Sequence, residues 1–206
     1  MARSGRARVR SKAATRVTHR TWAIATIVVV AIIVIAAVAY YYVGPGHRGV
    51  QTASQSPIVG KAQVGQTAPE FEVSTTAGLF DLATVAQPVF LEVFATWCPH
   101  CQRETVVVDK LYNKYRSRVA FVAVSGSNTA MDGTSASSQL DVLDWARRFN
   151  VQYPVAYDEL LNVANLYLQG GFPTFALIGK DKKVAYLNSG EVSFGELDAA
   201  VAKLLR

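Results

Sequence analysis

Cysteine is nearly absent from this chain of 206 residues, which has only two cysteines, three histidines and two methionines. Two cysteines exclude a framework of several disulfides. A zinc site needs four ligands, and only Cys98, His100 and Cys101 lie close together in the sequence. The other two histidines, His19 and His47, are far upstream. The residue after the second cysteine is Gln rather than His, which excludes a covalent haem attachment motif.

Acidic residues are absent from residues 1–20, which carry seven Arg or Lys side chains. This tail accounts for the net charge of +6, because the rest of the chain has 14 basic and 15 acidic side chains. The rest therefore gives no reason to expect nucleic-acid binding. The tail alone could be read as a nucleic-acid-binding arm, but the apolar segment that follows it favours a signal for membrane topology.

Charge is absent from the 22 residues between Trp22 and Val43. As a helix they would extend about 33 Å, enough to cross the hydrocarbon core of a membrane. Because Ile and Val occupy every face, we expect residues 21–43 to be a single transmembrane anchor. The positive-inside rule makes residues 1–20 a cytoplasmic tail and places the remainder outside the cytoplasm, at the cell membrane. A cleaved signal peptide, with Ala37-Val38-Ala39 as its cleavage site, is the alternative.

The remaining chain divides into a linker and one domain. Residues 44–63 are rich in Gly, Ser, Gln and Pro, which is typical of a flexible linker. Residues 64–206 have the pattern of an α/β domain, with a polar loop over 125–138. We expect strands over 69–73, 78–81, 88–95, 118–124, 155–157, 174–178 and 183–188, and helices over 99–116, 138–149, 158–168 and 193–205. Leu140, Leu143 and Trp145 are candidate core residues of the second helix.

The two cysteines lie between the buried strand and the helix that follows it. This position places both sulfurs at a helix N-terminus, where free N–H groups and the helix dipole stabilise a thiolate. Because the thiolate is the reactive form in disulfide exchange, we interpret Cys98 and Cys101 as a redox-active disulfide. A purely structural disulfide is a weaker alternative, since so short a loop adds little stability. Copper(I) bound by Cys98, His100 and Cys101 stays open as a second alternative.

The element order resembles that of the membrane-anchored TlpA/ResA-like thiol-disulfide oxidoreductases. Three segments carry the resemblance: 64–71 (VGQTAPEF), 94–101 (FATWCPHC) and 171–175 (GFPTF). It implies a thioredoxin-like fold over residues 64–206, in which helices flank a central mixed sheet. It also implies exchange with protein thiols and disulfides, a membrane redox partner, and no bound cofactor or metal.

The dipeptide between the cysteines departs from that family, whose sites commonly place Pro directly before the second cysteine. Pro99-His100 is instead the dipeptide of DsbA-type oxidases. We therefore expect an oxidant of protein thiols. A reductant in cytochrome c maturation and a copper(I) metallochaperone are the alternatives.

Four side chains in and around the cysteine motif, together with Pro173, are expected to be catalytic. Cys98 is the expected nucleophile, Cys101 resolves the mixed disulfide, and His100 stabilises the Cys98 thiolate by hydrogen bonding or charge. Glu92, where the family carries a buried acid, would exchange a proton with Cys101, since burial raises a carboxyl pKa. Glu104 corresponds to an acid of ResA-like members, with a solvated helix residue as the alternative.

Pro173 matches the family's cis-proline. The resemblance implies that it faces the cysteines and blocks metal access, and that the backbone of Phe172 pairs with an extended substrate. Trp97 is expected to pack beside the motif and, secondarily, to contact substrate.

Overall fold

The computed structural model describes residues 28–35, 37 and 60–206. Residues 28–35 are helical and exposed. The predicted tail, most of the predicted anchor and most of the predicted linker lie outside the described residues. Among the described residues, no helix is both long enough and apolar enough to cross a membrane.

Seven strands form one mixed sheet in the order β2-β1-β5-β4-β3-β6-β7. The strands are β1 (Glu72–Thr75), β2 (Gly78–Asp81), β3 (Val89–Phe94), β4 (Ala120–Ser125), β5 (Val155–Tyr157), β6 (Thr174–Ile178) and β7 (Val184–Ser189). Strands β3, β4 and β5 are parallel, whereas β6 is antiparallel to both β3 and β7. The mixed sheet that the sequence predicts is therefore confirmed.

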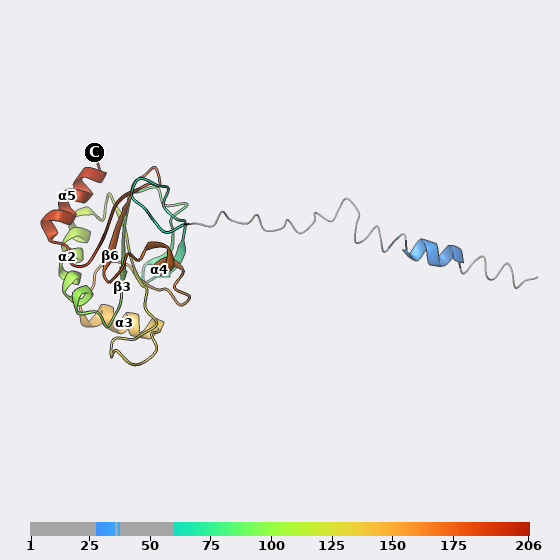
Figure 1. The fold of residues 1–206 in the computed structure, drawn as a ribbon, viewed down its shortest axis with the longest axis horizontal. Helices are drawn as coiled ribbons and strands as arrows, with labels where there is room; N and C mark the ends of the chain where they lie inside the picture. The colour runs from blue at the N-terminus through green and yellow to red at the C-terminus, as the bar shows by residue number, and fades with distance from the viewer. Residues whose placement is uncertain (1–27, 36, 38–59) are drawn as a thin grey trace, which may run out of the picture. The chain divides into compact units, whose positions relative to one another are not determined.

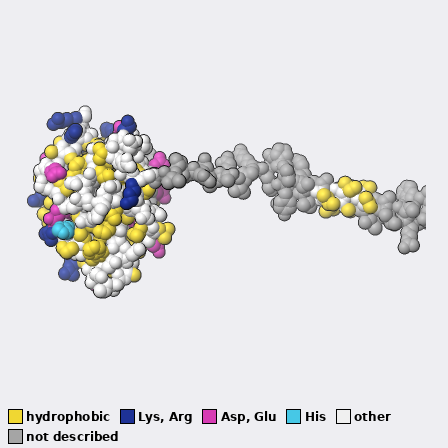
Figure 2. Space-filling view, in the orientation of Figure 1, with side chains coloured by type: hydrophobic (Ala, Val, Ile, Leu, Met, Phe, Trp, Pro, Cys, Tyr) yellow, Lys and Arg dark blue, Asp and Glu magenta, His cyan; other side chains and the backbone are white. Residues whose placement is uncertain are grey.

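Helices cover both faces of this sheet. They are α2 (Pro99–Tyr115), α3 (Gln139–Arg148), α4 (Asn162–Tyr167) and α5 (Phe194–Leu204). Figure 1 shows α2 and α5 side by side on one side of the sheet, with α4 on the other. In Figure 2, basic and acidic side chains are scattered over the visible face of the domain among apolar and uncharged groups.

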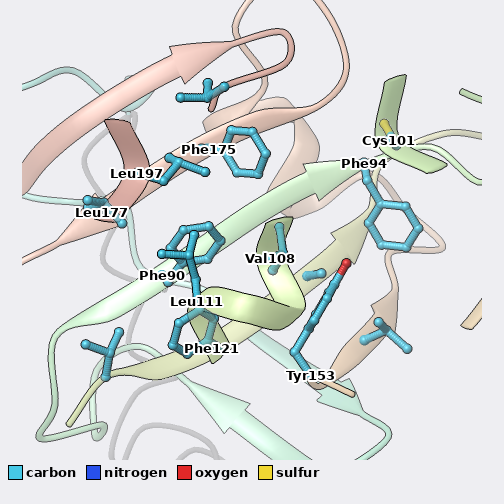
Figure 3. Close-up of a cluster of buried hydrophobic side chains, with 14 of the residues drawn as sticks. Phe90, Phe94, Cys101, Val108, Leu111, Phe121, Tyr153, Phe175, Leu177 and Leu197 are labelled. Atoms are coloured by element: carbon cyan, nitrogen blue, oxygen red, sulfur yellow. The ribbon is translucent and has the colours of Figure 1, made fainter. Parts of the chain in front are cut away.

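The central strand β3 is buried along its whole length. Because alternate side chains of a strand point to opposite faces, Phe90 and Phe94 belong to a hydrophobic cluster with side chains of α2, α3 and α5 (Figure 3), whereas Leu91 and Val93 belong to a second cluster with side chains of α4. The same alternation directs Glu92 to the α2 side, between the two phenylalanines. An acid is thus built into the larger of two hydrophobic clusters.

Several element boundaries differ from the sequence prediction. The first strand begins at Glu72 rather than at 69, because Ala68 donates its N–H to Lys182 O (2.7 Å) and the preceding segment pairs with the β6–β7 turn. Helix α4 begins at Asn162 rather than at 158, because the Asp158 carboxylate accepts the N–H groups of residues 162–164. Ala62, inside the predicted linker, is buried and donates its N–H to Leu166 O.

One prediction about the α3 region needs correction. Leu140 is 69% exposed, and Val142 takes its place in the core beside Trp145. Asp141 of α3 also holds the polar loop 125–138 against the domain. One Asp141 oxygen accepts the Met131 N–H (2.9 Å), and the other accepts the Thr96 hydroxyl (2.7 Å) just before the cysteine motif.

Candidate active site

The cysteine pair lies where β3 ends and α2 begins. Cys98 is the N-cap of α2 and Pro99 occupies its first turn, as expected for a residue that lacks an N–H. The Cys101 N–H points at the Cys98 sulfur over 3.5 Å. Both residues are free thiols; the exposed fraction is 4% for Cys98 and 0% for Cys101. A substrate sulfur can therefore approach Cys98 more readily than Cys101.

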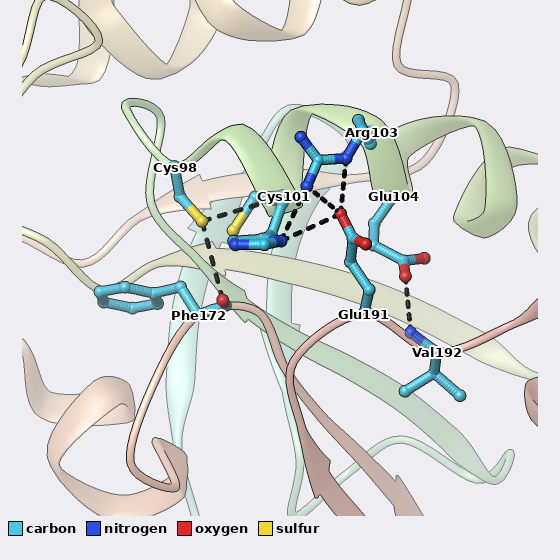
Figure 4. Close-up of polar contacts among 8 residues, drawn as sticks. Cys98, Cys101, Arg103, Glu104, Phe172, Glu191 and Val192 are labelled. Atoms are coloured by element: carbon cyan, nitrogen blue, oxygen red, sulfur yellow. Dashed lines mark hydrogen bonds and ion pairs between the residues drawn. The ribbon is translucent and has the colours of Figure 1, made fainter.

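The loop before β6 covers the Cys98 sulfur from the other side. The Phe172–Pro173 peptide bond is cis, as the resemblance implies. The Cys98 thiol donates to the Phe172 carbonyl over 3.7 Å (Figure 4). Trp97 meets the Phe172 ring edge to face with centroids 6.0 Å apart, and its Nε1 donates to the Ser127 hydroxyl over 2.8 Å. Residues 97, 98, 172 and 173, all singled out from the sequence, are thus brought together.

Gly126 is a site residue that the sequence analysis did not single out. A Cβ at this position would lie 2.7 Å from Ala164 Cβ and 2.8 Å from Val93 Cγ1. The Phe172 ring would be 3.6 Å away. Only glycine therefore lets the end of β4 approach α4 and the Phe172 loop this closely. A glycine just after a buried strand was the available signal.

Glu92 is completely buried, as predicted, below the cysteines. Neither of its carboxylate oxygens has a hydrogen-bond partner, nor does the Tyr153 hydroxyl, which lies near it and is labelled in Figure 3. Burial, helped by the charge of Glu104, raises the pKa of Glu92 to about 8, although the Tyr153 hydroxyl partly offsets this rise. A group that is half protonated near pH 8 can both accept and donate a proton at ordinary pH.

Burial also raises the pKa of the Cys101 thiol, and the nearby Glu92 carboxylate raises it further. Cys101 therefore holds its proton unless a base removes it. Since Glu92 is the charged neighbour that perturbs Cys101 most, the two groups are suited to exchange that proton.

Glu104 is buried rather than solvated, with an exposed fraction of 3%. One carboxylate oxygen accepts the Val192 N–H over 2.6 Å, and the other has no hydrogen-bond partner. Burial raises the pKa of this carboxyl despite the Val192 hydrogen bond. The alternative of a solvated helix acid is therefore wrong.

His100 projects from the first turn of α2 with a side chain that is 57% exposed. Its Nδ1 lies 3.1 Å from Glu191 Oε1 and 2.8 Å from a guanidinium nitrogen of Arg103. The sequence suggested that His100 contacts the Cys98 sulfur. In the structure its Nδ1 instead contacts these two charged groups. Glu191 follows α2 by many tens of residues, so no local sequence pattern could have linked it to His100.

Beside α2, a pocket of about 280 Å³ is lined by Arg103, Glu104, Val107, Glu191, Val192 and Ser193. Within residues 60–206 and the short described helix, no three His, Cys, Asp or Glu side chains are grouped to hold a metal ion. Copper(I) would need Cys98, His100 and Cys101 to converge. Another pocket, of about 820 Å³, lies at the other end of β3 between Pro88 and the β6–β7 turn.

Comparison with known proteins agrees with this geometry. The Redoxin family model matches residues 63–204. A thiol-disulfide oxidoreductase ResA of Bacillus cereus is 30% identical over 149 residues, which cover 70% of this chain and 80% of that protein. ResA of Geobacillus thermodenitrificans is 32% identical over 133 residues, covering 63% and 71%.

Solved structures share the fold. A putative thiol:disulfide interchange protein DsbE from Chlorobium tepidum superposes with a TM-score of 0.62 at 22% identity, covering 71% of this chain and all of that one. StoA from Bacillus subtilis gives a TM-score of 0.54 at 18% identity, with 65% and 96% covered. The CXXC pair on such a fold agrees with the Redoxin match over most of the chain and with the ResA relatives at 30% identity. This chain therefore belongs to the Redoxin family as a thioredoxin-like, TlpA/ResA-like thiol-disulfide oxidoreductase.

Proposed function

We propose that this protein is a membrane-tethered, extracytoplasmic oxidant that transfers its Cys98–Cys101 disulfide to protein thiols. The observation that carries the direction is the position of the Cys98 sulfur, which caps α2 and faces the Cys101 N–H at 3.5 Å. A thiolate at a helix N-terminus is stabilised by that N–H and by the helix dipole. Stabilising the reduced form makes the corresponding disulfide more oxidising.

The reaction starts from the oxidised pair. A substrate thiolate attacks the Cys98 sulfur, a new S–S bond forms, and the Cys98–Cys101 bond breaks. Cys101 leaves with the electron pair and takes a proton, for which protonated Glu92 is the nearby donor. A second substrate thiolate then attacks the substrate sulfur bound to Cys98 and releases the Cys98 thiolate. Two electrons pass from the substrate to the cysteine pair, and a membrane redox partner must remove them again.

The reduction potential tests the direction. We expect equilibration with glutathione buffers to give a value less negative than the thioredoxin value of about −270 mV and nearer to about −180 mV, as in protein disulfide isomerase. Each tenfold stabilisation of the reduced form contributes about 30 mV for this two-electron couple. A potential at or below that of thioredoxin would instead assign a reductant.

Membrane tethering is supported by the sequence, with seven basic residues before an uncharged apolar stretch of membrane-spanning length. The chain has no cysteine outside the redox site, so a thiol reagent reports directly on where that site is. A membrane-impermeant maleimide added to intact, reduced spheroplasts should label the protein. The Cys98→Ser/Cys101→Ser double variant is the blank, and labelling only after lysis would place the site in the cytoplasm.

A further inference from the structure

Two buried polar side chains in the larger hydrophobic cluster, Glu92 and Tyr153, lie close to each other. Glu92 is completely buried and Tyr153 is 3% exposed. Neither the Glu92 oxygens nor the Tyr153 hydroxyl has a hydrogen-bond partner, although each group perturbs the pKa of the other. Buried polar groups are nearly always paired, so a neighbouring donor and acceptor that are both unpaired need an explanation.

The register of the central strands explains why Tyr153 can reach Glu92. Glu92 of β3 pairs with Ala123 of β4, and Ala123 pairs with Val155 of β5. Tyr153 precedes Val155 by two residues and belongs to the same hydrophobic cluster as Val155 and Ala123. Since Ala123 has only a methyl group, the Tyr153 ring has room over β4. Figure 3 shows its hydroxyl directed toward the end of β3 that carries Phe94.

The charged groups around the Glu92 carboxyl act against its ionisation. Glu104, Asp109 and Cys101, all on α2, are acids, and the first two raise the pKa of Glu92 together with burial. Its register partners, Ala123 and Phe175, carry no charge. The buried side chains that α3 and α5 contribute to the cluster are also uncharged: Val142, Trp145, Leu197 and Val201.

The Tyr153 hydroxyl is the group that acts in the opposite direction, by lowering the pKa of Glu92. Burial and the Glu92 charge raise the pKa of the hydroxyl itself well above its usual value. Tyr153 therefore keeps its proton wherever Glu92 titrates, and it remains a hydrogen-bond donor. A carboxylate accepts such a bond more strongly than a neutral carboxyl group does.

We propose that Tyr153 is a positioning residue that donates a hydrogen bond to ionised Glu92 and so stabilises the base that removes the Cys101 proton. The inference rests on the exchange chemistry proposed above. When a mixed disulfide is resolved, the Cys101 thiol passes its proton to Glu92 and its sulfur forms a bond with the Cys98 sulfur. The bond between Cys98 and the substrate breaks, and the substrate sulfur leaves with the electron pair.

The test is the pH dependence of mixed-disulfide resolution in the full-length protein in detergent. The probe is an aromatic disulfide that releases one coloured thiolate when Cys98 attacks and a second when Cys101 resolves. In wild type, the second release should become faster around pH 8, as Glu92 ionises. In Tyr153→Phe the midpoint should rise by about one pH unit, and the rate at pH 7 should fall about tenfold.

Tyr115→Phe is the matched control, because Tyr115 is also buried but donates its hydroxyl to Asp198 over 2.8 Å. Its midpoint should equal that of wild type. In the Glu92→Gln background, Tyr153→Phe should slow resolution no further. An unchanged or lowered midpoint in Tyr153→Phe, or the same slowing in the Glu92→Gln background, would overturn the role of Tyr153.

Wild type that contains ring-fluorinated tyrosine gives a second measurement, which does not depend on the folding of a variant. Fluorination makes the hydroxyl a stronger donor, so the midpoint should fall, and a midpoint that stays in place contradicts the proposal. If only the midpoints fail to move, this inference fails alone. If wild type releases no first thiolate, the exchange function fails and this inference fails with it.

Discussion

Cys98 and Cys101 are separated by a single helical turn but lie in different surroundings. Cys98 faces the Cys101 N–H and the Phe172 carbonyl, whereas burial and Glu92 keep the Cys101 thiol protonated by raising its pKa. This difference supports the prediction that Cys98 attacks and Cys101 resolves the mixed disulfide.

We predict that Cys98→Ser abolishes exchange and that Cys101→Ser accumulates mixed disulfides with substrate proteins through Cys98. The difference between the sulfurs should also appear in alkylation of the reduced protein at neutral pH, followed by mass spectrometry of the labelled peptides. Cys98 should react at least about tenfold faster, because the thiolate is the reactive form. Faster labelling of Cys101 would reverse the assignment.

The predicted proton exchange between Glu92 and Cys101 can be tested separately from the first attack. Glu92→Gln should slow the resolution of a mixed disulfide at least about tenfold near pH 8, because the amide cannot accept the Cys101 proton. In wild type, the resolution rate should rise as Glu92 ionises, around its pKa of about 8, and this rise should be lost in the variant. Stopped-flow kinetics of mixed-disulfide resolution in wild type and variant check this prediction. The rate of Cys98 alkylation is the control and should stay nearly unchanged in the variant. Equal resolution rates at every pH would leave Glu92 only a structural role.

Helix α3 connects the loop 125–138 to the start of the cysteine motif through one carboxylate. Asp141 accepts hydrogen bonds from the Met131 N–H and the Thr96 and Ser137 hydroxyls. Thr96 precedes Cys98 by two residues, so the position of the motif depends on a helix that is remote in the sequence. The site is therefore held by this helix as well as by its own strand.

Asp141→Ala should destabilise the domain by about 2 kcal/mol, since it leaves buried donors without acceptors. Urea unfolding of residues 60–206 measures the difference. The control is Asp144→Ala in the same helix, which removes only an exposed ion pair with Arg147 and should change the free energy of unfolding by less than about 1 kcal/mol. If both variants lose the same stability, the link through Asp141 is not what holds the loop.

Local sequence patterns predict most helices and strands of this domain well, but they predict the contacts that fix helix starts and buried faces poorly. The apolar run of β3, Pro99 at the start of α2 and the turn between β6 and β7 all reflect short-range chemistry, and each lies where it was expected. The start of α4 depends on the Asp158 carboxylate, and the exposure of Leu140 depends on which face of α3 meets the sheet. The first outcome is decided by a side-chain hydrogen bond to the backbone and the second by packing, and hydrophobic periodicity contains neither.

The redox site as a whole is assembled at the carboxyl end of β3 from segments distant in the sequence. The strand brings Cys98 and Glu92, the β6 loop brings Phe172 and Pro173, and the β7–α5 loop brings Glu191. The motifs and the resemblance identify the members from the first two segments. Glu191 could not be found in this way, because only the folded chain brings its loop to His100 of α2.

The unpartnered carboxyl of Glu92 also makes the stability of the whole domain depend on protons. Its pKa is about 8 in the folded chain against an ordinary value of 4.5, so between these values the folded form holds a proton that the unfolded chain has released. The free energy of unfolding must then fall as pH rises from about 4.5 to 8, by up to about 5 kcal/mol from this group alone.

Urea titrations of the reduced domain at several pH values should show this slope, and Glu92→Gln should flatten it. Glu104 and Asp109, whose pKa values are also raised by burial, contribute with the same sign, so the variant should keep a smaller residual slope. An identical slope in the variant would contradict the assignment. The fold of the reduced domain should thus be more stable in mildly acidic than in mildly basic solution.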